Sequence, residues 1–212
     1  MNVVNPYKYP FKINNSFLLD GTKYFNIPLG TIDGVLFGAS KSFTLGLMVY
    51  IDDVTNVQYL FKGGSNIFTL IFNPTNNRLY FWVKGGGVQY YMIALNADIT
   101  TVGWYFLNII VDGVTPANSE IFVNAASKSV SKNMSTNIDT TLIQLGSTLV
   151  GNLSSFGVID GVQTREKCEE WYHKGKPKNP QTLFGNACKW FFNPDKSGDI
   201  APVIVKDYVN NI

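Results

Sequence analysis

Aromatic and cationic side chains alternate along one short segment of the chain and are suited to stacking against a sugar. Arg78, Tyr80 and Trp82 occupy every second position, which places them on one face of an extended strand. Tyr90 and Tyr91 follow in the next apolar segment. Aromatic rings stack on the apolar face of a sugar, and an arginine adds directional hydrogen bonds. The alternative is that one face of these strands is core and the other contacts a second subunit.

Carboxylates that catalyse glycoside hydrolysis stand closely spaced on one strand, in a pattern such as Glu-x-Asp-x-x-Glu. The sequence contains no such pattern. Asp52 and Asp53 close an apolar run, as turn residues do. The acidic residues of a helix-like segment are Glu166, Glu169 and Glu170. The single histidine, His173, has no nucleophile near it in sequence, so we expect no catalytic residues and no enzymatic activity.

Oxygen ligands for calcium are present but scattered. The conceivable ligands are Asp20, Asp112, Asn124 and Asp139. No dense acidic loop groups them, so we expect no metal site and no cofactor, with calcium as the open alternative. The two cysteines, Cys168 and Cys188, are too few for a Cys-only zinc site. They could pair if the fold brings them together, but we expect buried thiols.

The composition is that of a globular β protein with no strong charge. The chain has 212 residues, of which 45% are hydrophobic and 15% charged, and its net charge is +2. This balance gives no reason to expect a nucleic-acid partner. The amino terminus lacks the basic and apolar regions of a signal peptide, and no apolar run approaches the roughly 20 residues of a membrane helix. We therefore expect a soluble protein without membrane insertion or N-terminal export signal.

Short apolar runs separated by Gly, Asn and Asp predict a meander of antiparallel strands. The predicted strands cover residues 42–51, 58–62, 67–72, 78–83, 89–94, 104–112, 120–124, 142–146 and 153–159. One segment, 164–174, has helical features, with Thr164 as a capping residue and Gly175 just past its end. Many strands and one short helix predict an all-β, two-sheet antiparallel sandwich.

Five elements in this order resemble laminin-G-like jelly rolls of the concanavalin-A-like class. They are an opening strand at 17–28 with Asp-Gly-Thr and Ile-Pro, an "SFT" strand at 42–51, a "WYF…VDG" strand at 104–113, "IFVNA" at 121–125, and a closing element at 145–158. The resemblance covers about residues 16 to 177 and implies a jelly roll. This fold hosts lectins, hydrolases, adhesion modules and virion proteins, so it does not fix the function.

Three positions depart from the family pattern. Ser155 and Gly157 stand where the family usually has acidic and basic residues, and Phe106 stands where it has His. Each change removes a polar group, which disfavours a binding site at these positions.

Residues 178–212 form a predicted C-terminal extension after a jelly roll at 1–177. The segment 183–207 resembles an element that follows such domains in structural proteins of gut phages, including crAss-like phages. We expect the extension to pack on the domain or on a neighbouring subunit. The residues expected at a subunit contact are Trp190, Phe191 and Phe192.

These resemblances make a non-enzymatic phage virion protein the first functional hypothesis. It would act as a capsid decoration, head-fibre or tail-fibre module within the virion, as a homo-oligomer such as a trimer, with capsid or fibre subunits as partners. The alternative is a carbohydrate-binding lectin module that recognises a host or surface glycan. The two are compatible, because a displayed jelly roll can also contact surface sugars.

Overall fold

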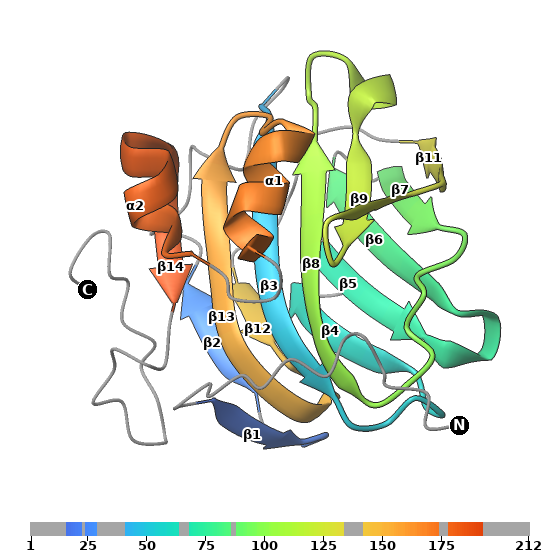
Figure 1. Ribbon diagram of the computed structural model, residues 1–212. Helices are drawn as coiled ribbons and strands as arrows, with labels where there is room; N and C mark the ends of the chain where they lie inside the picture. The colour runs from blue at the N-terminus through green and yellow to red at the C-terminus, as the bar shows by residue number, and fades with distance from the viewer. Residues whose placement is uncertain are drawn as a thin grey trace, which may run out of the picture.

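Two antiparallel sheets of seven strands each pack face to face around one large hydrophobic core (Figure 1). The computed structural model describes residues 16–22, 24–28, 41–63, 68–85, 88–133, 142–173 and 178–192. The arrangement confirms the all-β jelly-roll sandwich expected from the sequence. We call the two layers sheet A and sheet B.

Sheet A has the strand order β1-β13-β3-β8-β9-β10, and β14 also pairs with β13. Its strands are β1 (Phe17–Asp20), β3 (Phe43–Ile51), β8 (Gly103–Val111), β9 (Glu120–Val123), β10 (Ala126–Lys128), β13 (Val150–Asp160) and β14 (Cys188–Phe192). Since β3 pairs along one edge of β13, β1 and β14 share its other edge, one after the other.

Sheet B has the strand order β11-β7-β6-β5-β4-β12-β2. Its strands are β2 (Phe25–Pro28), β4 (Gln58–Gly63), β5 (Phe68–Asn73), β6 (Arg78–Gly85), β7 (Val88–Ala94), β11 (Val130–Asn133) and β12 (Leu142–Leu145). All nine segments predicted as strands from residue 42 to residue 159 are strands, with ends within three residues of those observed. The prediction missed the short strands β10 and β11, which have little apolar alternation, and also β14. The predicted opening strand at 17–28 is two strands, β1 in sheet A and β2 in sheet B.

The main core lies between the sheets and contains a group of packed phenylalanine rings. Phe61 stacks on Phe68 with ring centroids 5.2 Å apart, and Phe81 meets Phe68 edge-on at 5.4 Å. Phe156 of sheet A meets Phe61 at 5.9 Å, which joins the two layers. Each fully buried ring stabilises the fold by roughly 1.5–3 kcal/mol relative to an exposed one.

The outer face of sheet A is covered by the helix α1 (Arg165–Tyr172), which lies across β13, β3 and β8 (Figure 1). Its N-cap is Thr164, as predicted, and the helix ends at His173 in a left-handed conformation with φ 41°. Trp171 lies directly on Gly46: a Cβ added to this glycine would be 2.2 Å from the indole ring. The strand β3 is therefore buried on both faces.

Two of the three departures from the family pattern, Gly157 and Phe106, lie against this helix. A Cβ added to Gly157 would be 2.9 Å from the Trp171 ring, so glycine makes room for the tryptophan. Phe106 meets Trp171 edge-on at 5.4 Å and stacks on Tyr172 at 5.9 Å. At these two positions the polar groups of the family are replaced by apolar packing.

Residues 178–192 also pack on sheet A. A second helix, α2 (Pro180–Phe184), was not predicted; Asn179 caps it and proline occupies its first turn. Phe191 is only 3% exposed and belongs to the cluster around Trp171. This predicted subunit contact is therefore buried within its own chain. The backbones of residues 190 and 192 pair with β13, but their side chains are not among those that the structure describes. Residues 193–212 lie outside the described residues.

Both cysteines are buried thiols, as expected, and they lie in separate apolar clusters. Cys168 packs with Ile110 and Phe122 beneath α1. Burial, with a smaller contribution from nearby glutamates, raises the pKa of Cys168 to about 12. A thiol with such a pKa is unreactive at neutral pH. None of the helices in the described ranges has the length and apolar character needed to cross a membrane.

Candidate functional site

The outer face of sheet B carries most of the residues expected to bind sugar. Arg78, Tyr80 and Trp82 alternate along β6 and are half-buried. The residues between them, Leu79, Phe81 and Val83, are fully buried in the main core. The predicted alternation of β6 is thus present, and its three candidate side chains share the outer face.

A continuous row of polar and aromatic residues crosses this face through Trp82. In register, Trp82 lies opposite Tyr91 on one side and opposite Thr69 on the other. The whole row, from β12 to β11, is Gln144, Lys62, Thr69, Trp82, Tyr91 and Asn133. Directly opposite side chains in antiparallel strands have Cβ atoms about 4.5–5.5 Å apart, so each member can contact the next. We call this set the polar-aromatic row.

Tyr90 does not belong to this surface. It lies opposite Val83 and packs against the main core, whereas Tyr91 lies on the outer face. Adjacent residues of a strand point to opposite faces, so only one of the two tyrosines can join Trp82. The structure therefore brings together Arg78, Tyr80, Trp82 and Tyr91 on one face and leaves Tyr90 on the other.

The aromatic side chains of the face have fixed neighbours. Tyr80 and Trp82 meet edge-on with ring centroids 5.9 Å apart. The Tyr80 hydroxyl accepts a hydrogen bond from Asn76 Nδ2 at 2.7 Å. On β4, Lys62 Nζ lies 5.3 Å from the centroid of the Tyr59 ring, a cation–π contact. Rings held in this way lose little conformational freedom when a ligand stacks on them.

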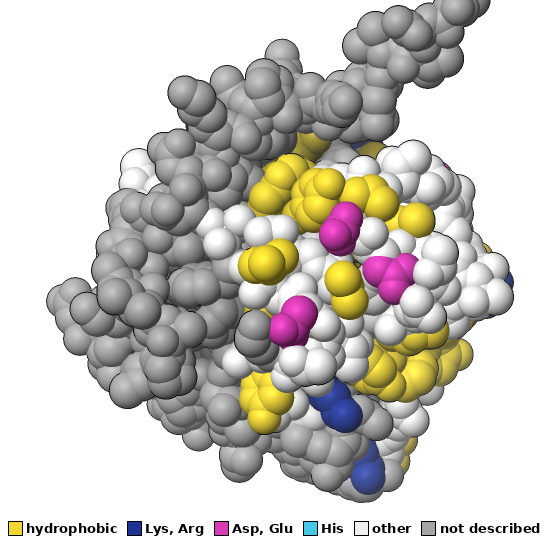
Figure 2. Space-filling view, turned by 90° about the horizontal axis from the view of Figure 1, so that it is seen from below, with side chains coloured by type: hydrophobic (Ala, Val, Ile, Leu, Met, Phe, Trp, Pro, Cys, Tyr) yellow, Lys and Arg dark blue, Asp and Glu magenta, His cyan; other side chains and the backbone are white. Residues whose placement is uncertain are grey.

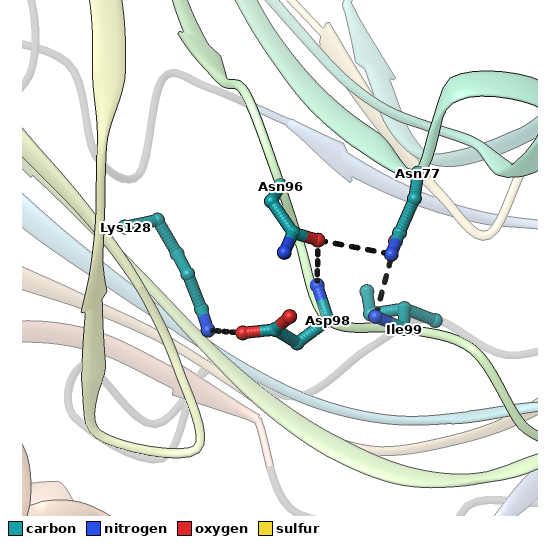
Figure 3. Close-up of polar contacts among 5 residues, drawn as sticks. All are labelled: Asn77, Asn96, Asp98, Ile99 and Lys128. Carbon is teal, nitrogen blue, oxygen red and sulfur yellow. Dashed lines mark hydrogen bonds and ion pairs between the residues drawn. The ribbon is translucent and has the colours of Figure 1, made fainter.

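The turn before β6 is held by the network in Figure 3. Asn77 has a left-handed backbone, φ 50°, and its Nδ2 donates to Asn96 Oδ1 at 3.0 Å. The amide of Ile99 donates to Asn77 Oδ1 at 3.1 Å, and that of Asp98 donates to Asn96 Oδ1 at 3.0 Å. Lys128 of β10 pairs with the Asp98 carboxylate. These contacts fix the turn from which β6 starts.

Two buried polar atoms on this face have no hydrogen-bond partner: Thr69 Oγ1 and Arg78 Nε. Thr69 is fully buried although its side chain points to the outer face, between Lys62 and Trp82 in the row. A buried polar group without a partner costs about 1–3 kcal/mol, so such groups are few in native proteins. In the described part of the chain only one other such atom occurs, Asn108 Oδ1 in sheet A.

The strands of sheet B, in their described bounds, contain basic residues and no acidic ones. The basic residues are Lys62, Arg78, Lys84 and Lys132. The Lys132 ammonium donates to the Ser119 carbonyl, and the other three alternate with core residues and so point outward. The lower end of the sandwich shows acidic side chains together with basic and hydrophobic ones (Figure 2).

Two of the conceivable calcium ligands, Asp20 and Asp112, cap their own turns. Asp20 accepts from the Thr22 amide and hydroxyl, and Asp112 accepts from two amides that follow it. Asn124 Oδ1 accepts a hydrogen bond from the Phe106 amide. Phe106 is six residues along the extended chain from Asp112, or roughly 20 Å, so Asn124 and Asp112 lie far apart. Asp139 lies outside the described residues. No group of three or more His, Cys, Asp or Glu side chains within the described ranges could hold a metal ion.

Sequence reasoning missed Lys62, Thr69, Gln144 and Asn133. Lys62 and Thr69 alternate with buried neighbours, but the alignment of all four residues with Trp82 depends on strand register. The register is shifted by a bulge between Tyr59 and Phe61, which the sequence does not reveal.

The family described as the concanavalin A-like lectin/glucanases superfamily matches residues 19–167, more than half of the chain. This range includes β3 to β13 and the whole polar-aromatic row. No curated protein sequence matches the chain.

Solved structures with the same fold include a bacterial sialidase module and a protein described as a putative carbohydrate-binding protein. The CBM40 of the Ruminococcus gnavus IT-sialidase bound to α2,3 sialyllactose has a TM-score of 0.56 at 12% identity, over 73% of this chain and 95% of that one. A putative carbohydrate-binding protein from Bacteroides ovatus has a TM-score of 0.62 at 14% identity, over 89% of this chain and 53% of that one. At these identities the likeness establishes the fold alone.

Proposed function

Because the chain belongs to the concanavalin A-like lectin/glucanase superfamily, we propose that it binds a carbohydrate on the outer face of sheet B. The observation that carries this proposal is the polar-aromatic row, in which Trp82 and Tyr91 lie side by side between polar residues. Their half-buried rings offer apolar surface for the face of a sugar ring, and the polar neighbours offer hydrogen bonds to its hydroxyl groups.

The proposed role is binding without catalysis. Glycoside hydrolysis requires an acid and a second carboxylate on either side of the scissile bond. The strands of sheet B provide amides, hydroxyls and cations on this face, and no carboxylate within their described bounds. Two solved proteins with this fold, the CBM40 and the Bacteroides ovatus protein, are described as carbohydrate-binding, which supports the same role here.

The virion hypothesis has weaker support than the lectin alternative. It rests on the resemblance of residues 183–207 to phage structural proteins and on the aromatic cluster at 190–192, whose central residue, Phe191, is buried within the chain. The matched family and the similar structures favour sugar binding. Display on a larger assembly remains compatible with a sugar-binding face.

The test compares two tryptophans on opposite faces of the sandwich. Trp82→Ala should abolish binding on a glycan array and change the melting temperature little, because Trp82 belongs to none of the apolar clusters formed by the described residues. Trp104→Ala is the matched control, since Trp104 is also partly buried but packs on Tyr50 and on the cluster of sheet A. This variant should lower the melting temperature and retain binding. Binding by Trp82→Ala at the level of the unaltered protein would refute the proposed site.

A further inference from the structure

A second aromatic ring lies next to Trp82 on the outer face of β6. Tyr80 is two residues before Trp82, so the two side chains are about 7 Å apart along the strand on the same face. Their ring centroids are 5.9 Å apart. The proposed sugar-binding function uses Trp82 with Tyr91 on the next strand and does not use Tyr80. A ligand stacked on Trp82 therefore has a further ring beside it along β6.

The surface around Trp82 differs from one direction to another. On β5 its neighbour is Thr69, which is fully buried and offers a ligand no accessible hydroxyl. Along β6 toward the end of the strand, the next outward residue is Lys84, which carries no ring. Toward the start of β6, Tyr80 is half-buried, and Ile93 lies opposite it on β7. The accessible aromatic surface thus continues from Trp82 toward the start of β6.

The hydroxyl of Tyr80 is oriented by Asn76. This residue ends the short 3-10 helix Pro74–Asn76 before β6, and its Nδ2 donates to the Tyr80 hydroxyl at 2.7 Å in an exposed contact. The hydroxyl end of the ring therefore points toward this turn and away from Trp82. A phenolic oxygen that accepts one hydrogen bond still has its own proton to donate. No described residue accepts that proton, so an accessible donor with a fixed neighbour remains.

The planes of the two rings are nearly perpendicular. The angle between the Tyr80 and Trp82 rings is 72°. A flat surface of packed polysaccharide chains could stack on both rings only if they lay in one plane. A free chain can contact both, because its successive sugar units turn about the bonds that join them. The angle therefore favours a free chain over a crystalline surface.

We propose that the site on sheet B extends along β6 and binds a free glycan chain of at least two sugar units. One unit stacks on Trp82, and the next lies at Tyr80, whose hydroxyl donates a hydrogen bond to it. The step of about 7 Å between the two residues exceeds the length of one sugar ring, so a single unit on Trp82 does not reach that hydroxyl. The inference rests on the proposed sugar-binding function and adds the length and physical form of the ligand.

The experiment measures the affinity of the full chain against glycan length. A glycan array carries gluco-, manno-, xylo- and chito-oligosaccharides of one to four units together with animal glycans. Titration calorimetry then compares the best-binding chain with its shorter members. We expect two units to bind at least about fivefold more tightly than one, the effect of about one added hydrogen bond. A pull-down on microcrystalline cellulose and crystalline chitin tests the flat-surface alternative, and we expect no retention there.

Tyr80→Phe removes the proposed donor and keeps the ring. It should reduce affinity for the two-unit chain about fivefold and leave affinity for the single unit within about twofold. Tyr50→Phe is the matched control, because Tyr50 also meets a tryptophan edge-on, Trp104 at 5.4 Å, but in sheet A. This control should change neither affinity.

Asn76→Asp tests the role of Asn76 as a positioning residue. A carboxylate at this position accepts the Tyr80 proton, so the hydroxyl no longer donates it to the chain. The loss for the two-unit chain should match that of Tyr80→Phe and should not add to it in the double variant. Asn73→Asp introduces the same charge in the same turn and keeps the bond from the Thr75 amide, so it should leave both affinities unchanged.

The outcomes separate the two proposals. Equal affinity for one and two units would overturn the extended site and leave sugar binding intact. Equal losses for both lengths in Tyr80→Phe would place Tyr80 at the unit on Trp82 and would also overturn it. Retention on the crystalline solids as strong as binding of the soluble chain would contradict the free-chain ligand. Failure to bind any printed glycan would refute the sugar-binding function and this inference with it.

Discussion

The two sheets have similar strands, but the side chains on their outer faces differ in character. On sheet A, Gly46 and Gly157 leave space that Trp171 fills, and residues 178–192 extend the same apolar layer. On sheet B, the corresponding face presents half-buried aromatic rings, unpaired polar atoms and three cations. The two faces therefore differ in role: packing on sheet A stabilises the sandwich, and the outer face of sheet B carries the residues proposed to bind a sugar.

The largest effect on stability is expected from removing the central ring of the covered face, Trp171. Trp171→Ala should lower the free energy of unfolding by about 3–5 kcal/mol, because it leaves a cavity beneath α1. Urea unfolding followed by circular dichroism measures the loss. Glycan affinity of the folded variant should stay unchanged, since Trp171 lies on the opposite layer. A loss below about 1 kcal/mol would show that α1 is not a packed cover.

The fit between Trp171 and Gly46 gives a second, smaller effect. Gly46→Ala places a methyl group 2.2 Å from the indole ring and should cost about 1–3 kcal/mol. In a Trp171→Ala background the same substitution should cost much less, so a double-mutant cycle should show a coupling of more than about 0.5 kcal/mol. Gly103→Ala is the control in the same sheet, because nothing lies within 4 Å of its added Cβ. Additive losses would contradict the assigned contact.

The sugar-binding face can be tested through the turn that supports it. Asn77→Ala should cost about 1–2 kcal/mol, because alanine resists the left-handed backbone and cannot replace the hydrogen bonds to Asn96 and Ile99. Glycan affinity should fall as well, since Arg78 is the next residue. Asn77→Gly keeps the backbone conformation and isolates the side-chain bonds. If both variants bind as the unaltered protein does, the turn does not position the face.

The sequence predicts where the strands lie better than it predicts which of their faces are buried and which residues share a face. Alternation from Phe43 to Ile51 located β3, but only the position of Trp171 explains why its second face is also buried. The helix α2 escaped prediction because five residues are too few to show a helical period. Arg78, Tyr80 and Trp82 were placed together correctly by alternation within one strand. Lys62 and Thr69 join them only through register, which is a property of paired strands.

The smallest effect concerns one of the turns that connect the two sheets, the one between β3 and β4. Asp53 lies between β3 and β4, and hydrogen bonds donated by Thr55 and Asn56 lower its pKa from the ordinary value of 3.8 to about 2. A depressed folded-state pKa stabilises the fold above pH 3.8, and this contribution disappears as the pH falls through about 2.

Asp53→Asn should therefore flatten the decline in stability between these two pH values, measured as melting temperature against pH. Asp52→Asn changes the same charge one residue away and should keep the decline. Because the turn joins sheet A to sheet B, acid should weaken both layers at once, so ligand binding should be lost together with the fold. If binding on sheet B disappeared at a higher pH than unfolding, the turn would not be the link, and an ionisable group of the ligand would be responsible.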